Sequence, residues 1–275
     1  MSGKIIFLDI DGTLTLPGSN EPPQSALDAI KKAQSLGHKV YLCTGRNPAM
    51  LSPLLKYGFD GAVASAGGYI FSGDTVIYDC PMTEDQRQRS MDLFKANGVY
   101  RTIEAKDASY CDDGMAEFMG KVSGGNSELV RWRKAIESSL NIQSISKYDG
   151  RPIYKIIFMC ETLDQLKPAI ESLEDEFYFL VQDATDGSYL NGELINKQFD
   201  KGEGVRRVVD HLGADMKDTI GFGDSMNDLE MIEAVAYGVC MENGSPTLKN
   251  FSQMICPSVE DDGLAKAFAE LGLLG

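Results

Sequence analysis

The chain has 275 residues, and its 41 Asp and Glu outnumber its 26 Lys and Arg, which gives a formal net charge of −15. This acidic excess argues against nucleic acids and anionic membranes as partners, because both select for basic surfaces. The six cysteines form no Cys-x-x-Cys pair and only two histidines are present, so we expect neither a zinc site nor a disulfide framework. The start has no signal-peptide pattern and no long apolar run occurs, which indicates a cytoplasmic protein.

Strands and helices alternate in the first part of the chain. The apolar run 4–9 predicts a strand buried on both faces, and the helix-periodic segment after it ends at Gly37. Further strands are expected at 40–43 and 61–65, followed by a hairpin over 70–78. Such alternation predicts a Rossmann-like, doubly wound α/β core with a mostly parallel sheet.

The same alternation returns in the last third of the chain. The expected helices span 202–212, 227–236 and 263–273, and the expected strands span 219–222, 237–241 and 253–256. We expect these elements to complete the sheet that the first strands begin.

Between these two parts lies a segment of different character. Thr83 opens a capping-box pattern for a helix that stops at Gly98. Two further helices are expected at 126–140 and 163–174, and three strands at 99–103, 153–159 and 177–181. The segment is about 100 residues long, which is an ordinary size for a domain. We therefore predict that residues 83–186 form an inserted α+β domain and that residues 1–82 and 187–275 form the core.

Two carboxylates follow the first predicted strand directly, in the segment Asp9-Ile10-Asp11-Gly12-Thr13. Ligands of open α/β sheets bind beyond the carboxyl ends of the strands, which is where these side chains fall. One acid of such a pair can act as a nucleophile or metal ligand, and the other as a proton shuttle. Taken alone, the pattern is also compatible with a turn or with a fragment of a calcium-binding loop.

A second acidic motif follows the predicted strand at 219–222. Asp224 and Asp228 offer two more carboxylate ligands there, although acids that cap a helix would look the same. Four acids at the ends of two buried strands are harder to explain as caps. Because the set contains only oxygen ligands, it predicts a hard-cation site that suits Mg²⁺.

Two weaker motifs complete the candidate site. Thr44 and Gly45 end the second predicted strand, where a hydroxyl and backbone N–H groups can surround a phosphate, although a simple turn is an alternative. Lys201 opens a helix at the end that disfavours a cation, which suggests that it meets an anion there. A solvated surface lysine is the alternative for Lys201.

Taken in chain order, the motifs at Asp9, Thr44, Lys201 and Asp224 strongly resemble those of the haloacid dehalogenase superfamily, and in particular of the Cof-type sugar-phosphate phosphatases. The resemblance runs over nearly the whole chain, but the insert matches only in size and position. It implies that the insert is an α+β cap domain and that Mg²⁺ is the cofactor. One departure is the Ser-Ala-Gly-Gly segment 65–68, where many relatives carry Asn-Gly, and it bears on the substrate pocket rather than on the core chemistry.

The resemblance also implies a role for each acid. Asp9 would attack phosphorus and form an aspartyl-phosphate. Asp11, oriented by Thr13, would protonate the leaving oxygen and then take a proton from water. The implied Mg²⁺ ligands are Asp9, the backbone carbonyl of Asp11, Asp224 and Asp228.

The remaining motif residues would bind the phosphoryl group. Thr44 and Lys201 would hold its oxygens, and Gly45 would contribute backbone N–H groups. Asn227 would add a side-chain donor. Together with Mg²⁺, Lys201 would offset the repulsion between the acids and a phosphate dianion.

The resulting hypothesis is a Mg²⁺-dependent phosphatase that hydrolyses a small phosphorylated metabolite, with a sugar phosphate as the expected class. A phosphomutase that uses the same aspartyl-phosphate is the nearest alternative, and a non-catalytic phospholigand-binding module is another. We expect the protein to be a monomer or a homodimer.

Overall fold

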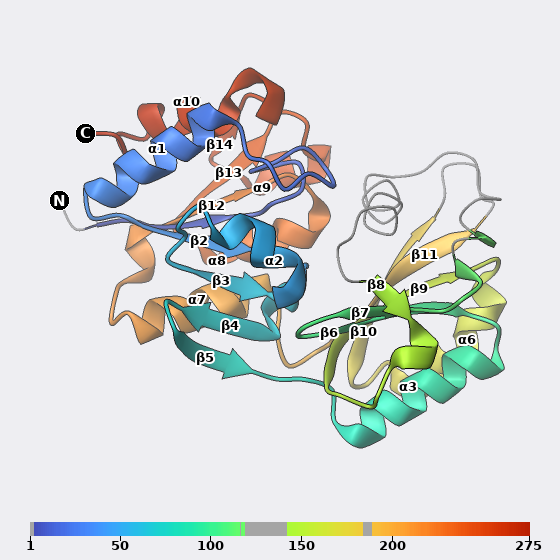
Figure 1. Cartoon of the computed structure of the whole chain (residues 1–275). Coiled ribbons are helices and arrows are strands. Elements are labelled where there is room, and N and C mark those ends of the chain that lie inside the picture. The colour runs from blue at the N-terminus through green and yellow to red at the C-terminus, as the bar shows by residue number, and fades with distance from the viewer. Residues whose placement is uncertain (1–2, 116, 119–141, 184–188) are drawn as a thin grey trace. The chain divides into compact units, whose positions relative to one another are not determined.

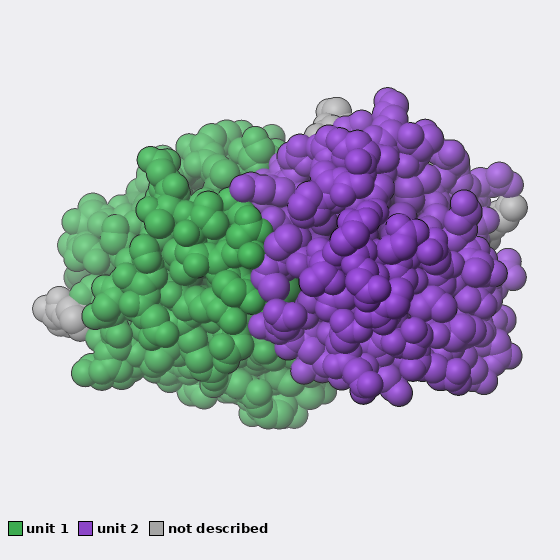
Figure 2. All heavy atoms as spheres, turned by 90° about the horizontal axis from the view of Figure 1, so that it is seen from below, with its two compact units in different colours: residues 1–46, 51–79, 199–275 green, residues 47–50, 80–198 purple. Residues whose placement is uncertain are grey.

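The structure is a computed structural model that describes residues 3–115, 117–118, 142–183 and 189–275. The chain divides into two compact units, which Figure 2 colours separately. The core unit comprises Met1–Arg46, Leu51–Asp79 and Phe199–Gly275, and the insert unit comprises Asn47–Met50 and Cys80–Gln198. The helix expected at 126–140 lies outside the described residues.

The core unit is built on an eight-stranded sheet with the order β14-β13-β12-β1-β2-β3-β4-β5. The strands from β14 to β3 are parallel, whereas β4 and β5 form an antiparallel hairpin at one edge. Their bounds are β1 Ile5–Leu8, β2 Lys39–Cys43, β3 Gly61–Ala64, β4 Tyr69–Ser72, β5 Thr75–Asp79, β12 Thr219–Gly223, β13 Tyr237–Met241 and β14 Met254–Cys256. All four residues of β1 are buried, as expected for a strand covered on both faces.

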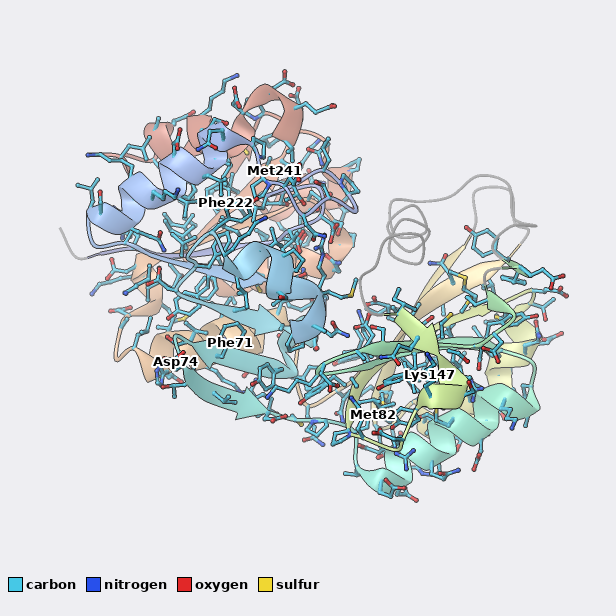
Figure 3. All side chains as sticks on the ribbon, in the orientation of Figure 1. Phe71, Asp74, Met82, Lys147, Phe222 and Met241 are labelled. Carbon is cyan, nitrogen blue, oxygen red and sulfur yellow. The ribbon has the colours of Figure 1, made fainter. Side chains whose placement is uncertain are left out.

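Helices cover both faces of this sheet, with α1 and α10 packed together on one face and α7 and α8 packed together on the other (Figure 1). The helices outside residues 80–198 are α1 Gln24–Ser35, α2 Pro48–Leu55, α7 Lys201–His211, α8 Leu229–Ala234, α9 Pro246–Phe251 and α10 Gly263–Glu270. Phe222 of β12, labelled in Figure 3, packs against Phe268 of α10 inside the core unit, with ring centroids 5.5 Å apart. The layers confirm the Rossmann-like α/β class that the alternation predicts.

The helix expected at 227–236 is interrupted. A 3₁₀ turn, Met226–Asp228, precedes α8. The Asp228 carboxylate accepts hydrogen bonds from the backbone N–H groups of Asp224 (3.0 Å) and Ser225 (3.1 Å). These bonds close a tight turn between β12 and α8, so the α-helix begins only after Asp228.

The insert unit contains a six-stranded sheet with the order β10-β11-β9-β6-β7-β8, in which only the β7–β8 pair is parallel among the described strands. The strands are β6 Tyr100–Ala105, β7 Ser109–Cys111, β8 Ile142–Ser144, β9 Ile153–Cys160, β10 Phe177–Asp183 and β11 Leu190–Asn196. Two helices, α3 (Glu84–Ala96) and α6 (Leu163–Leu173), pack side by side against this sheet. Met82, labelled in Figure 3, belongs to the apolar cluster under these helices.

The predicted capping box of the insert is present. Thr83 Oγ1 accepts a hydrogen bond from the Gln86 backbone N–H (3.2 Å), and Gln86 Oε1 accepts one from the Thr83 backbone N–H (3.0 Å). Each side chain thus satisfies a donor that the start of a helix leaves without an intrahelical partner.

The sequence does not predict β11, because Leu190–Asn196 mixes polar residues with Gly192. The strand nevertheless pairs with both β9 and β10. Gly192 permits this pairing, since a Cβ atom there would lie 2.3 Å from the carbonyl oxygen of Leu180. The insert unit therefore continues to Gln198, beyond the expected end at residue 186.

No helix in the described part of the chain combines the length with the apolar character that crossing a bilayer requires.

Candidate functional site

The candidate site is built at the carboxyl ends of neighbouring parallel strands. Asp9 directly follows β1, and its backbone N–H donates to the Phe222 carbonyl of β12 (3.0 Å). Thr44 directly follows β2, and its backbone N–H donates to the Val63 carbonyl of β3 (2.8 Å). The strand ladders thus continue into the site and fix the backbone of both residues.

Lys201 connects the two acidic motifs. It is the first residue of α7, and its ammonium Nζ lies 2.8 Å from Asp9 Oδ1 and 2.6 Å from Asp228 Oδ1. The side chains of Lys201 and Asp228 are only 2% and 0% exposed. Burial alone would lower the pKa of Lys201, but the charges of Asp228 and Asp9 hold that pKa well above its ordinary value. Lys201 therefore carries a positive charge inside the core unit and is no solvated surface lysine.

Three carboxylates surround this single lysine. One oxygen atom from each of Asp9, Asp224 and Asp228 lies within 4.8 Å of the other two. Burial, followed by the charge of Asp228, raises the pKa of Asp9 to about 7. Burial, followed by the charges of Asp9 and Asp228, raises the pKa of Asp224 to about 9. The metal-free cluster therefore favours protonated carboxylates, because Lys201 alone does not offset three ionised ones.

This donor set fits a divalent cation. Asp224 Oδ1 is buried without a hydrogen-bond partner among the described residues. Gly12 leaves room beside this carboxylate, since a Cβ atom at Gly12 would lie 2.3 Å from Asp224 Oδ2. A hard cation with oxygen ligands would satisfy the unpartnered oxygen and balance the excess charge. The residues that could hold it are Asp9, Asp224 and Asp228.

Asp228 differs from the other two acids of the cluster. Its Oδ1 accepts from Lys201, and its Oδ2 accepts from two backbone N–H groups of the turn after β12. Both of its oxygens therefore have protein partners. Its contacts shape the turn and hold Lys201.

Asp11 points to a different partner. The guanidinium of Arg46 donates from Nε to Asp11 Oδ2 (2.9 Å) and from Nη2 to Asp11 Oδ1 (2.7 Å). The hydroxyl of Thr13, expected to orient Asp11, is buried without a hydrogen-bond partner among the described residues. Of these two side chains, Arg46 is therefore the one that hydrogen-bonds to Asp11, whereas the role that the resemblance implies for Thr13 stays a prediction. Its position right after Thr44 and Gly45, at the end of a strand beside β1, is the signal that could have revealed it.

The remaining predicted residues border the same region. Thr44 is buried, and its Oγ1 accepts from the Arg46 backbone N–H (3.1 Å). Gly45 follows it and is partly exposed. Asn227 is exposed, and its Oδ1 lies 3.5 Å from Lys201 Nζ. Thr44 and Asn227 are therefore tied to Arg46 and Lys201, respectively.

The turn after β3 packs between the end of β2 and the start of α7. The backbone N–H groups of Ser65 and Ala66 donate to the carbonyls of Arg46 (2.8 Å) and Thr44 (2.9 Å). Ser65 and Ala66 both have left-handed backbone conformations, with φ of 50° and 57°. A Cβ atom at Gly67 would lie 2.3 Å from the Asp200 carbonyl oxygen. Space at this turn is tight enough to require glycine, and non-glycine residues hold a conformation that they rarely adopt.

Known proteins are similar to this chain over nearly its whole length. A family model of haloacid dehalogenase-like hydrolases matches residues 6–268. The protein "Putative phosphatase YkrA" of Bacillus subtilis is 29% identical over 100% of both chains. The "5-amino-6-(5-phospho-D-ribitylamino)uracil phosphatase YwtE" of the same organism is 27% identical over 95% of this chain and 96% of that protein.

The fold is also similar to solved structures. A hypothetical protein from Geobacillus kaustophilus superposes with a TM-score of 0.81 and 24% identity, over 99% of this chain and 100% of the other. The family match covers both halves of the core unit and the insert between them. This chain therefore belongs to the family of haloacid dehalogenase-like hydrolases.

Proposed function

We propose that the protein is a Mg²⁺-dependent phosphatase that hydrolyses a small phosphorylated metabolite, with sugar phosphates as the substrate class, through an aspartyl-phosphate on Asp9. The observation that carries this proposal is the pairing of the buried Asp9 carboxylate with the buried Lys201 ammonium, 2.8 Å apart. A carboxylate nucleophile beside a fixed cation is what phosphoryl transfer needs.

Asp9 supplies the attacking oxygen. Its carboxylate forms a bond to phosphorus while the bond from phosphorus to the leaving oxygen breaks. Lys201 stabilises negative charge on the transferring phosphoryl group, and the Thr44 hydroxyl donates a hydrogen bond to an oxygen of that group. Mg²⁺, when bound by Asp9 and Asp224, supplies further positive charge that allows two anions to approach each other.

Asp11 moves the protons. In the first half-reaction it donates a proton to the leaving oxygen, which departs as an alcohol. In the second half-reaction it removes a proton from water, whose oxygen attacks phosphorus and releases the Asp9 carboxylate and inorganic phosphate. Asp11 therefore ends the cycle in the protonation state in which it began.

The substrate class rests on the relatives. A relative 27% identical over almost the whole chain carries a name that describes the phosphate of a ribityl compound. The strong acidity of the chain, with a net charge of −15, also favours a small ligand whose charge is met locally over an extended polyanion.

The test is phosphate release from a panel of sugar phosphates and phosphorylated cofactors, with Mg²⁺ or with EDTA. Wild type is expected to release phosphate only with Mg²⁺. Asp9→Asn is expected to lose turnover by about 10⁴-fold or more, because an amide cannot attack phosphorus. Asp74→Asn, an exposed acid in the β4–β5 turn labelled in Figure 3, is the matched control and should behave as wild type.

Other outcomes would point elsewhere. Steady turnover by a clean Asp9→Asn preparation would overturn the covalent mechanism. Conversion of a phosphate ester to its isomer without phosphate release would favour the phosphomutase. Binding of phosphate esters without either reaction would favour a non-catalytic module.

A further inference from the structure

The guanidinium of Arg46 is a buried cation whose nitrogens all donate hydrogen bonds within the core unit. Its side chain is 2% exposed, and the paired Asp11 side chain is 13% exposed. Two parallel N–H···O contacts, 2.9 Å from Nε and 2.7 Å from Nη2, join the guanidinium to the two oxygens of Asp11. Such a fork-to-fork pair fixes the carboxylate in plane and in rotation, which a single hydrogen bond does not.

The same guanidinium also holds the loop that follows Asp11. Arg46 Nη1 donates to Asn20 Oδ1 (2.6 Å), and Nη2 donates to the Ser19 carbonyl (3.1 Å). The backbone N–H of Gly18 closes the loop by donating to Asp11 Oδ1 (2.8 Å). Arg46 is thus placed either to anchor this loop or to orient Asp11, and the two roles make different predictions.

Arg46 is connected to the phosphate side of the site as well. Its backbone N–H donates to Thr44 Oγ1 (3.1 Å), and its backbone carbonyl accepts from Ser65 (2.8 Å). A shift of Arg46 would therefore move Asp11 relative to Thr44. Small misplacements of a catalytic group are costly, because proton transfer needs the two heavy atoms within hydrogen-bond reach.

We propose that Arg46 is a positioning residue that holds the Asp11 carboxylate in the orientation needed for both proton transfers. This inference rests on the proposed function, in which Asp11 donates a proton to the leaving oxygen and later accepts one from water. Arg46 itself exchanges no proton and acts only through the Asp11 carboxylate to which it donates.

The two half-reactions respond differently to the loss of such a residue. Bond breaking to an alkyl oxygen needs the proton of Asp11, because an alkoxide is a poor leaving group. Bond breaking to p-nitrophenolate does not, because this anion leaves without protonation. Attack of water on the aspartyl-phosphate needs Asp11 as a base whichever substrate was used. Loss of Arg46 should therefore spare the first half-reaction with p-nitrophenyl phosphate and slow the second.

The experiment is rapid mixing of the full-length protein with p-nitrophenyl phosphate at saturating Mg²⁺. Arg46→Ala is expected to release about one equivalent of p-nitrophenol per protein in a burst, followed by a steady rate about 100-fold below that of wild type. The sugar phosphate preferred by wild type should give no burst with this variant. Arg46→Lys keeps the positive charge but loses the two parallel hydrogen bonds of the guanidinium. Its steady rate should exceed that of Arg46→Ala by less than tenfold.

Two further variants separate orientation from anchoring. Asn20→Ala removes an Arg46 contact on the loop without touching Asp11, so its steady rate should stay within about threefold of wild type. Asp11→Asn should reproduce the burst, and Asp11→Asn combined with Arg46→Ala should be no slower than Asp11→Asn alone, because the two residues act as one unit.

Each alternative result is informative. A slow reaction without a burst in Arg46→Ala and Arg46→Lys, or an equal loss in Asn20→Ala, would overturn the proposal in favour of a loop anchor. An unchanged steady rate in Arg46→Ala would also overturn it. If wild type shows no Mg²⁺-dependent turnover of any ester, the proposed function fails instead. If Arg46→Ala does not fold, the burst in Arg46→Lys decides.

Discussion

Each unit of the molecule buries a lysine between carboxylates, and the two clusters differ in how they are made. In the insert unit, Lys155 is 0% exposed, with its Nζ 2.7 Å from Glu193 Oε1 and 3.6 Å from Glu104 Oε2. Strand register accounts for this cluster. Glu104 of β6 lies directly opposite Lys155 of β9, and Glu193 of β11 lies diagonally across from it.

The cluster of the core unit has no such explanation. Lys201 and Asp9 are 192 positions apart in the chain, and both lie beyond the ends of regular elements or at their first residue. Asp224 beside them keeps a buried oxygen without a partner among the described residues. Buried charge alone therefore does not mark a site. Placement of the carboxylates just beyond the carboxyl ends of parallel strands does, as with Asp9 after β1 and Asp224 after β12.

The largest expected effect concerns the stability of the insert unit. Lys155→Met leaves the buried Glu104 and the partly buried Glu193 without this cation, so the free energy of unfolding should fall by about 3–5 kcal/mol. Replacing all three residues by apolar ones should restore much of this loss. Urea unfolding followed by circular dichroism measures both changes. A loss of activity by more than tenfold in folded Lys155→Met would contradict the contrast between the two clusters, because the Lys155 cluster would then also serve the reaction.

The core lysine should show the reverse pattern. Lys201→Ala removes a preorganised charge from the transferring phosphoryl group, so kcat/KM should fall by about 10²–10³-fold, or about 2.7–4 kcal/mol. Steady-state kinetics on the substrate preferred by wild type measures this change, with Lys155→Met as the matched control. A loss of less than tenfold would remove Lys201 from the role assigned to it.

The pH dependence of the metal-free protein tests the excess negative charge of the core cluster. The pKa of Asp224 is raised from 3.8 to about 9, so the folded protein holds a proton there that the unfolded chain releases above about pH 4. Stability should consequently fall as the pH rises between about 4 and 9. In EDTA, Asp224→Asn should reduce the loss between pH 5 and pH 8 by at least about 1.4 kcal/mol.

Two controls sharpen this measurement. Asp74→Asn should keep the pH dependence of wild type, because its side chain is exposed. Saturating Mg²⁺ should reverse the trend for wild type, since the cation binds the ionised carboxylates and stabilises the folded state. A metal-free wild type whose stability rises between pH 5 and pH 8 would contradict the raised pKa of Asp224.

The smallest expected effect is at the strained turn after β3. Ala66 has φ of 57°, a conformation that costs an alanine about 1 kcal/mol and glycine almost nothing. Ala66→Gly should therefore raise the free energy of unfolding by about 1 kcal/mol. Ala265→Gly, inside α10, should lower it by a similar amount. Equal destabilisation by both substitutions would show that the turn carries no strain.

The sequence predicts, for a topological reason, that the acidic motifs of the core unit lie close together. Carboxyl ends of parallel strands meet at one edge of a sheet, so motifs after β1, β2 and β12 had to converge there once the strands were recognised. The apolar runs made that recognition straightforward. The position of Lys201 follows as well, because its helix packs on the same sheet.

Other features of the structure cannot be predicted from local sequence patterns. The pairing of Arg46 with Asp11 depends on how two loops approach each other, which the pattern of apolar and polar residues along the chain does not predict. The left-handed conformation of Ser65 and Ala66 is hidden because neither residue is Gly or Asn. β11 cannot be predicted because apolar and polar residues alternate only weakly along it. The glycine in its middle is explained only by the strands that pair with it.

The order of strands in the core sheet also sets when activity can arise during synthesis. β1 pairs early with β2, but its other neighbour, β12, begins only at Thr219, after the whole insert has been made. A nascent chain that ends at Gln198 holds Asp9 and Asp11 and still lacks Lys201, Asp224 and Asp228. The insert can fold on the ribosome while one edge of β1 is still unpaired. A chain synthesised only as far as Gln198 therefore cannot assemble the cluster in which Lys201 contacts Asp9 and Asp228.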